Sequence, residues 1–333
     1  MGHSGEIVTQ GDAVGAAQGT RRIRDREPLA YLVASLRGVG QVDLQPQLLT
    51  GAFILAALWA AGWKVGLFAT LGTLISTATA YLLAVDRGSI AQGLQGYSGC
   101  LTGIAMVVFL GNHLSTYLLT VAACVICTVL MATVTHFMKP YGLTALTSPF
   151  CIVSGVMVHG APSFARIWHG APAPVANPTV GDTGIAWSDL WRAFFSNVSQ
   201  IFLVDSWYVG LIMLVGLAFA GTRVLLAAAL GSVVGIVSAW ALGAPTELIR
   251  EGIYGYNAVL VAIAVGAVFL ADTVWNACYA AFGAGVSTGL TAAITTLFKP
   301  FHGHTFTWPF ILTTWMLMAA VPLLPRLRHA EAG

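Results

Sequence analysis

The sequence predicts an all-α polytopic membrane protein built from two homologous halves with inverted topology. Three observations lead to this fold class: charged residues are scarce, apolar stretches of helical length recur, and motifs of the first half return in the second. Of the 333 residues, 57% are hydrophobic and only 8% are charged, whereas soluble domains carry about 25% charged residues. Lipid must therefore cover much of the surface, and a soluble enzyme is excluded.

The apolar stretches fall into two sets of five. They cover residues 48–62, 64–85, 93–110, 114–137 and 143–160, and then 206–220, 222–243, 253–270, 272–296 and 305–324. A helix needs about 20 residues to cross a bilayer core. The second and fourth stretches of each set are long enough to span it, while the short first and last stretches indicate broken or re-entrant elements.

Internal repetition is the stronger signal. GLQGYSGCLTGIA at 93–105 matches GIYGYNAVLVAIA at 252–264 in 6 of 13 positions, at an offset of 159 residues. KPYGLTALTSPF at 139–150 matches KPFHGHTFTWPF at 299–310 in 5 of 12 positions, at an offset of 160. Such ordered matches indicate a tandem duplication. Five crossings per half would make the second copy enter the membrane from the opposite side.

The expected organisation follows from these stretches and from the loop charges. We expect a cytoplasmic N-terminal tail at 1–38, a first repeat at 39–160, a linker at 161–195, a second repeat at 196–324 and a C-terminal tail at 325–333. Ten of the 15 Lys and Arg residues fall on the side of the two termini, which the positive-inside rule places in the cytoplasm. We expect an integral protein of a bacterial inner membrane.

Charge and cysteine content exclude other classes of protein. A net charge of +2 without a basic stripe argues against a nucleic-acid partner. The five cysteines lie in apolar stretches, so Cys124 and Cys127, although spaced as CxxC, are interpreted as small packing residues rather than as redox or metal groups. We expect no metal and no cofactor.

The repeated motifs carry no charge, which favours a passive pathway for a neutral solute. Residues 88–138 contain no Asp, Glu, Lys or Arg, whereas ion coupling usually retains such groups inside spans. Thr147 and Thr307 each stand two residues before a proline, which in a spanning helix would free a backbone carbonyl. Facing each other, the two hydroxyls would suit a small amide; the alternative is that each bonds a carbonyl of its own helix.

Two further pairs suggest a narrow slot. Tyr97 precedes Leu101 by four residues, and Tyr256 precedes Leu260 by four, so each ring shares a helix face with a leucine. The alternative is that both tyrosines belong to the aromatic belt at the membrane interface. The glycines around them, at 93, 96, 99, 103, 252 and 255, are interpreted as close-packing positions between helices.

Together these motifs resemble the urea transporter family, in particular its bacterial urea channels. The resemblance spans residues 35–323 and rests on the repeated Gly-Tyr block followed by Leu, on the paired Thr-x-Pro-Phe, and on SQIFLVDSW at 199–207. It implies a passive urea channel that forms a homotrimer with one pore per protomer. It also implies five spans and one re-entrant pore helix per half, with that helix beginning near Gln41 and Gln200.

The resemblance also assigns site residues. Gln41 and Gln200 would be polar groups near the ends of the filter, with Val42 and Ile201 beside them. Tyr97 and Tyr256 would cover the flat faces of urea, and Leu101 and Leu260 would line the constriction. Thr147 and Thr307 would form the middle of the site, and Leu203 and Ile253 would complete the pore lining.

Some positions depart from the family pattern. Asp43 and Leu44 stand where an aromatic pair is usual, Ser98 stands opposite Asn257 of the second half, and Gln92 opposite Glu251. These departures bear on solute preference. Two rival functions therefore stay open: a channel for another small neutral solute, such as ammonia, water or a short amide, and an ion-coupled secondary transporter.

Overall fold

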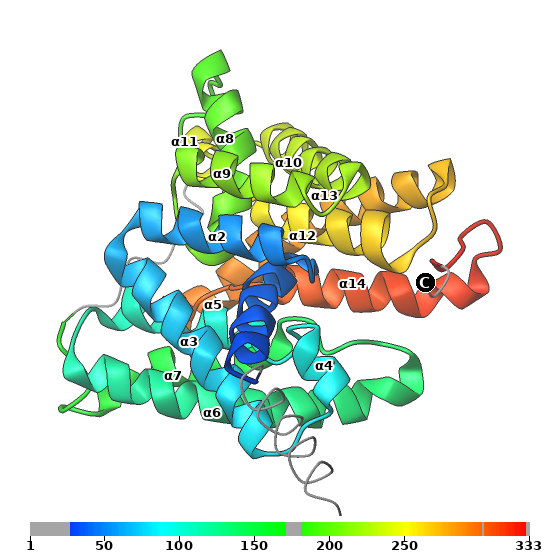
Figure 1. Cartoon of the computed structure of the whole chain (residues 1–333). Coiled ribbons are helices and arrows are strands. Elements are labelled where there is room, and N and C mark those ends of the chain that lie inside the picture. Colours follow the sequence, from blue (N-terminus) through cyan, green and yellow to red (C-terminus); the bar gives the residue numbers. More distant parts are fainter. Residues whose placement is uncertain (1–26, 171–180, 302, 331–333) are drawn as a thin grey trace, which may run out of the picture.

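The computed structural model describes residues 27–170, 181–301 and 303–330, and these residues form helices joined by short connections (Figure 1). The Arg-rich part of the expected cytoplasmic tail, Arg21 to Arg26, lies outside the described residues. Each of the ten apolar stretches contains a helix, which confirms an all-helical membrane protein.

The two halves contain the same helices in the same order. The first half consists of a helix at Glu27–Asp43, α2 (Leu48–Ala61), α3 (Trp63–Leu82), α4 (Arg87–Ala91), α5 (Tyr97–Leu110), α6 (Leu114–Met138) and α7 (Ser148–Gly160). The second consists of α8 (Trp187–Ser199), α9 (Trp207–Ala218), α10 (Thr222–Ala241), α11 (Thr246–Arg250), α12 (Tyr256–Ile263), α13 (Val274–Phe298) and α14 (Trp308–Ala320). Alpha-helix gives way to π-helix at Ala264–Phe269, directly after α12.

Four helices are long and apolar enough to cross a membrane. They cover Trp63–Leu82, Leu114–Tyr141, Thr222–Ala241 and Val274–Phe301. These are the second and fourth stretches of each set, as the sequence predicts. Two bent pairs raise the number of spans to as many as six: the helix Glu27–Asp43 turns by 79° into α2, and Trp187–Phe202 turns by 78° into α9.

The bends correct one expectation. Gln41 and Gln200 were expected at the start of a pore helix, but each lies in the last turn of the helix before the bend. The helices end there because the next residues, Leu44 and Leu203, adopt left-handed backbone conformations with φ of 61° and 59°. A left-handed residue cannot continue a right-handed helix. The glutamines therefore lie at helix carboxyl ends.

Positive backbone angles also repeat between the halves. Gly93 and Gly252 share a φ of 81°, which suits glycine because it has no Cβ. Leu146 and Phe306, 160 residues apart, have φ of 48° and 43°, values that are costly for residues with a side chain. The duplication seen in the sequence therefore extends to the strained positions of the backbone.

The helices pack through small residues, as the glycine pattern predicts. A Cβ at Gly99 would lie 2.1 Å from Ser76 Oγ, and a Cβ at Gly103 would lie 2.1 Å from the Phe68 carbonyl oxygen. These contacts bring α3 and α5 close together. In the second half, a Cβ at Gly255 would lie 2.1 Å from Asn197 Oδ1.

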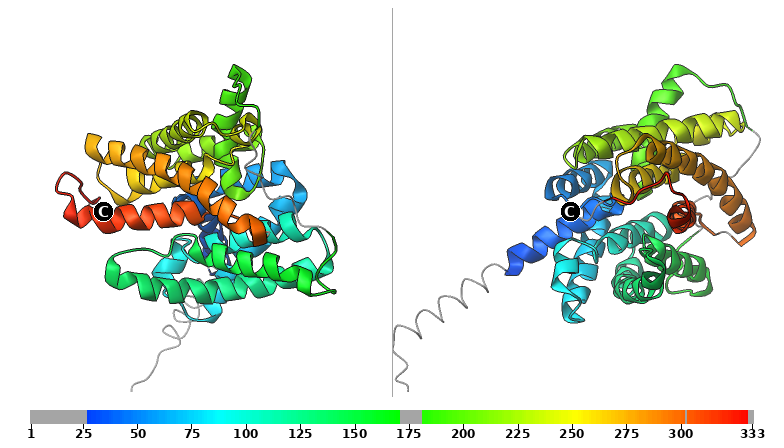
Figure 2. Two further views of the ribbon diagram at one scale, coloured as in Figure 1. Left: turned by 180° about the vertical axis from the view of Figure 1, so that it is seen from behind. Right: turned by 90° about the vertical axis from the view of Figure 1, so that its right-hand side faces the viewer.

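The arrangement in space brings the two halves together at their short helices. In Figures 1 and 2, α14 lies between a layer containing α6 and α7 and a layer containing α10, α12 and α13. The equivalent helices α2 and α9 also pack on each other, where Thr50 Oγ1 donates to the Gly216 carbonyl at 2.9 Å. The starts of α7 and α14 therefore lie inside the protein, which is where the candidate site forms.

Candidate functional site

The centre of the site is a pair of hydroxyl groups. Thr147 Oγ1 and Thr307 Oγ1 lie 2.6 Å apart, within hydrogen-bonding distance, and the two residues are 2% and 1% exposed. They come from equivalent positions of the two halves and precede the first residues of α7 and α14. The structure therefore brings the two threonines together, and neither hydroxyl bonds a carbonyl of its own helix.

The prolines near these threonines act differently from the expectation. Pro149 and Pro309 lie in the first turns of α7 and α14 rather than inside a continuous spanning helix. Proline is tolerated there because the first amides of a helix have no partner within the helix. The carbonyls next to the threonines are available because the chain before Thr147 and Thr307 is not helical.

The two tyrosines bind those carbonyls. Tyr97 Oη donates to the Leu146 carbonyl at 2.6 Å, and Tyr256 Oη donates to the Phe306 carbonyl. Both rings are buried, so the interface-belt interpretation of these tyrosines is wrong. Leu146 and Phe306, whose carbonyls accept these hydrogen bonds, are also the residues with left-handed backbone conformations.

These contacts form one polar line across the interior. It runs from the Tyr97 hydroxyl to the Leu146 carbonyl, through the paired hydroxyls of Thr147 and Thr307, to the Phe306 carbonyl and the Tyr256 hydroxyl. No charged side chain takes part in it. Each carbonyl and hydroxyl oxygen retains a lone pair that could accept an N–H group.

The amino ends of two helices converge at the middle of this line. Because Thr147 and Thr307 precede α7 and α14, the partial positive charges of both helix dipoles point to the threonine pair. The Phe310 amide in the first turn of α14 donates to Asn257 Oδ1 at 3.2 Å. Ser98 takes the place of Asn257 in the first half, and its hydroxyl has no partner within the described residues.

A third side chain contacts the threonine pair from one half only. Cys151 Sγ lies 3.2 Å from Thr307 Oγ1, whereas the equivalent residue in α14 is Ile311. The Thr307 hydroxyl therefore contacts two polar side chains, those of Thr147 and Cys151, whereas the Thr147 hydroxyl contacts one, that of Thr307.

A cavity of about 970 Å³ reaches the second half of the site. Four of the expected site residues line it: Gln200, Leu203, Ile253 and Tyr256. Gln200 Oε1 is buried and has no hydrogen-bond partner within the described residues. Because an unpaired buried amide oxygen is costly, this atom is suited to accept a hydrogen bond from a solute.

The lining of the cavity carries net negative charge. Four of its lining residues are acidic, Asp182, Asp189, Glu247 and Glu251, and one, Arg250, is basic. Burial raises the pKa of the Glu251 carboxyl above its ordinary value, and the nearby carboxylates of Asp205 and Glu247 raise it further. The equivalent residue of the first half, Gln92, is neutral, so the two ends of the site differ in charge.

Other expected site residues are buried without lining this cavity. Val42, Leu101 and Leu260 are 0% exposed, and Ile201 is 1% exposed. Gln41 is also buried, and its Nε2 donates to the Gln92 carbonyl at 2.9 Å. That these residues border a solute pathway stays a prediction.

Sequence reasoning missed several residues that line the cavity. His304, Thr305 and Thr295 are among them. Thr295 Oγ1 lies 2.6 Å from Thr305 Oγ1, and the His304 and Phe109 rings are tilted against each other with their centroids 3.9 Å apart. Comparison of the two repeats could have identified His304 and Thr305, because they stand where the first half has Thr144 and Ala145.

A buried carboxylate lies near the site in the sequence. Asp43 follows Val42, is 0% exposed, and has no hydrogen-bond partner for either carboxylate oxygen within the described residues. Its counterpart in the second half, Phe202, is equally buried. An ionised carboxylate without a partner would be very costly at such a position.

Known proteins resemble this chain over most of its length. The family model described as "Urea transporter" matches residues 32–322. The chain is similar to Urea transporter 1 of Rattus norvegicus, with 30% identity over 299 residues that cover 87% of this chain and 77% of the relative. It is also similar to Urea transporter 1 of Ovis aries, with 29% identity over 301 residues that cover 88% and 77%.

Proposed function

Because this chain belongs to the urea transporter family, we propose that it is a passive channel through which urea moves down its gradient along the line between Tyr97 and Tyr256. The protein is a membrane transport protein and not an enzyme. The observation that carries the proposal is the uncharged set of hydroxyl and carbonyl oxygens from Leu146–Thr147 and Phe306–Thr307, centred on the two threonines.

The chemistry of urea fits this line. Urea is planar, neutral and rich in N–H donors, so it loses hydrogen bonds to water when it enters a narrow passage. The hydroxyl and carbonyl oxygens along the line replace part of that hydration, and the rings of Tyr97 and Tyr256 would cover the faces of the solute. Partial replacement allows both entry and exit, which a fast passive pathway requires.

The same geometry opposes ions. No charged side chain on the line compensates the loss of hydration of an ion, and that loss is far larger than for a neutral amide. The amino ends of α7 and α14 add partial positive charge at the threonine pair, which opposes cations. The negative end of the cavity, at Glu247 and Glu251, opposes anions before they reach the line.

The proposal extends to the arrangement of the repeats and of the protomers, for which we adopt the pattern of the urea transporter family. We place the repeats at 39–160 and 196–324 in inverted orientation about an axis near the threonine pair, a relation that the matching helix order and the Thr147–Thr307 contact support. Both termini would face the cytoplasm of a bacterium, and three protomers would form a homotrimer with one pore each.

The test of the proposal is urea flux into proteoliposomes followed by stopped-flow light scattering. We expect flux that saturates weakly, needs no sodium or proton gradient, and is larger for urea than for methylurea, formamide or ammonia. Flux that vanishes when both gradients are removed would contradict a passive channel. A larger flux for ammonia or water than for urea would assign the pathway to another neutral solute.

One observation favours a second candidate, an ion-coupled transporter. Asp43 is a buried carboxylate beside Val42, and intramembrane carboxylates commonly serve proton or cation coupling. Asp43→Asn keeps the size and removes the titratable group. Coupled transport would make flux in the wild type depend on a gradient and would remove that dependence in the variant, whereas a passive channel conducts equally well in both without a gradient.

A further inference from the structure

A groove on the outside of the protein shares no lining residue with the solute line. It has a volume of about 520 Å³, and its two walls are the outer face of α13 and the segment Leu324–Leu327. The α13 wall includes Trp275, Cys278 and Phe282, and the Trp275 and Phe282 side chains are 54% and 62% exposed. The groove is therefore apolar and faces the surroundings of the protein.

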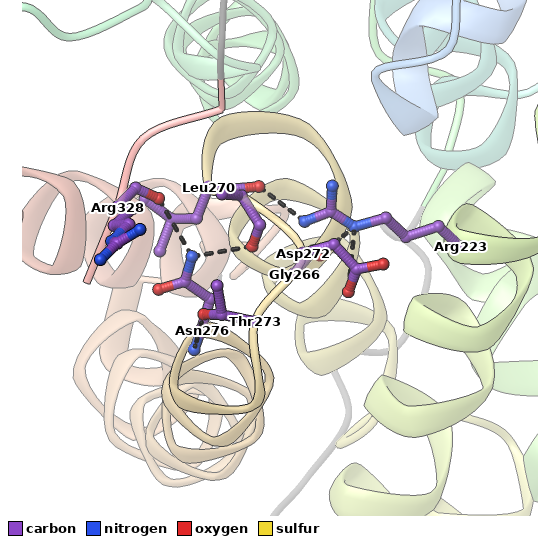
Figure 3. A network of polar contacts seen from close by, with 8 residues as sticks. Arg223, Gly266, Leu270, Asp272, Thr273, Asn276 and Arg328 are labelled. Atoms are coloured by element: carbon purple, nitrogen blue, oxygen red, sulfur yellow. Dashed lines mark hydrogen bonds and ion pairs between the residues drawn. The ribbon is translucent and has the colours of Figure 1, made fainter. Parts of the chain in front are cut away.

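The second wall is held in place by hydrogen bonds (Figure 3). Asn276 Nδ2 donates to the carbonyls of Ala271 at 2.7 Å and Arg328 at 3.0 Å. The Ala271 amide donates to the same Arg328 carbonyl at 2.9 Å, and the Ala330 amide donates to the Phe269 carbonyl at 3.0 Å. The C-terminal segment is thus tied to the start of α13, so the groove is a built part of the fold.

A cation lies at one end of the groove. The Arg326 guanidinium sits 4.5 Å from the ring centroid of Trp275. Within the described residues no carboxylate forms an ion pair with Arg326, and Asp272, three residues before Trp275, pairs instead with Arg223 at 4.0 Å. Arg326 therefore places a positive charge at the end of the apolar groove, and its guanidinium donors, which bond no carboxylate of the described residues, suit an anion.

The groove also lies beside helix ends, which is the level at which we expect the membrane surface. Trp275 stands in the first turn of α13, and Leu324–Leu327 follow the end of α14, so one helix begins and another ends beside the groove. Tryptophan and arginine are common at the level of lipid headgroups, where an apolar ring and a polar group meet their respective surroundings.

We propose that this groove is a binding site for an acidic phospholipid. One acyl chain lies along Trp275, Cys278 and Phe282, and the phosphate receives hydrogen bonds from Arg326. A zwitterionic lipid binds less well because its headgroup also presents a cation to Arg326. Charge complementarity selects this occupant, because apolar walls with one cation beside them match an acyl chain that carries an anionic headgroup.

Native mass spectrometry of the full chain tests the proposal with equal amounts of phosphatidylglycerol and phosphatidylcholine of matched acyl chains. We expect the wild type to retain phosphatidylglycerol several-fold over phosphatidylcholine. Arg326→Gln should lose this preference, and Cys278→Trp, which fills the groove, should lose bound lipid of both kinds. Arg192→Gln, which removes an arginine 5.3 Å from the ring centroid of Trp191 and outside this groove, is the matched control and should behave as the wild type does.

Three results would overturn the site. The first is equal phosphatidylglycerol retention by the wild type and Arg326→Gln, and the second is unchanged lipid binding in Cys278→Trp. The third is crosslinking of Cys278 between two copies of the chain, together with loss of the oligomer in Cys278→Trp, which would show that a second copy covers the groove. The lipid site and the channel function can fail independently of each other, because no residue of the groove belongs to the solute line. Urea flux measurements test the channel function alone.

Discussion

The paired hydroxyls of Thr147 and Thr307 allow a quantitative test of the oxygen line. Replacing both by valine keeps the shape of the side chains and removes both oxygens from the centre of the line. A solute that passes this point would lose two hydrogen bonds of about 1 kcal/mol each, so the barrier should rise by about 2 kcal/mol. A barrier higher by about 2 kcal/mol corresponds to a roughly 30-fold slower flux.

The single variants separate the two residues. Thr147→Val leaves the Thr307 hydroxyl with Cys151 Sγ at 3.2 Å, whereas Thr307→Val removes the side-chain partner of both Thr147 and Cys151. We therefore expect the fold to be destabilised more by Thr307→Val, since a buried hydroxyl without a partner costs about 1–3 kcal/mol. Thermal unfolding of the purified variants measures this difference.

The assay is stopped-flow light scattering on proteoliposomes with equal amounts of folded protein. Thr313→Val is the matched control, because Thr313 lies in the same helix, α14, is 0% exposed, and has no hydrogen-bond partner within the described residues. Its flux should stay close to that of the wild type. If the double variant also conducts at the wild-type rate, the role given to the two hydroxyls is wrong.

Three other predictions concern the tyrosines, the glycines and the charged end of the cavity. Tyr97→Phe and Tyr256→Phe each remove one hydrogen bond to the carbonyl of the residue before a threonine. The loss of a hydrogen bond of about 1 kcal/mol should slow urea flux about fivefold in each variant and lower its Tm. Unchanged flux in both variants would show that these hydrogen bonds have no part in the pathway. Gly99→Ala places a Cβ 2.1 Å from Ser76 Oγ and should prevent folding, whereas Gly289→Ala has no neighbour within 4 Å and should yield normal amounts of folded protein by size-exclusion chromatography. Burial raises the pKa of the Glu251 carboxyl in the folded protein, so the fold is more stable when this carboxyl is protonated than when it is ionised. We therefore expect Glu251→Gln to raise the Tm relative to the wild type at pH 7 but not at pH 4. An equal change of Tm at the two pH values would contradict this expectation.

The fold was largely predictable because lipid imposes a simple rule on the sequence. A segment that crosses a bilayer must be helical and apolar over a sufficient length, so the second and fourth stretches of each half could be identified directly. The glycines at 99 and 103 were also readable, because small residues at helical spacing allow close approach between membrane helices. Only part of the site was predictable in this way.

The helix ends near Gln41 and Gln200 could not be read from local preferences. Leucine favours helices, yet Leu44 and Leu203 adopt left-handed conformations that end them. Tertiary contacts stabilise such strained residues, and a propensity argument does not include those contacts. The same reason explains why Pro149 and Pro309 were expected inside spanning helices, although they stand in first turns.

The sequence by itself determined that this protein lies in a membrane, that motifs of its first half recur in order in its second half, that it belongs among urea transporters, and that these repeated motifs are neutral. These properties depend on composition, spacing and order, which the chain carries without being folded. The tertiary structure alone decided that Thr147 and Thr307 meet, that Tyr97 and Tyr256 bind the carbonyls beside them, and that His304 lines the cavity. Residues 160 positions apart can share a hydrogen bond only when two helix ends are brought to the same place, and packing between the halves is what brings them there.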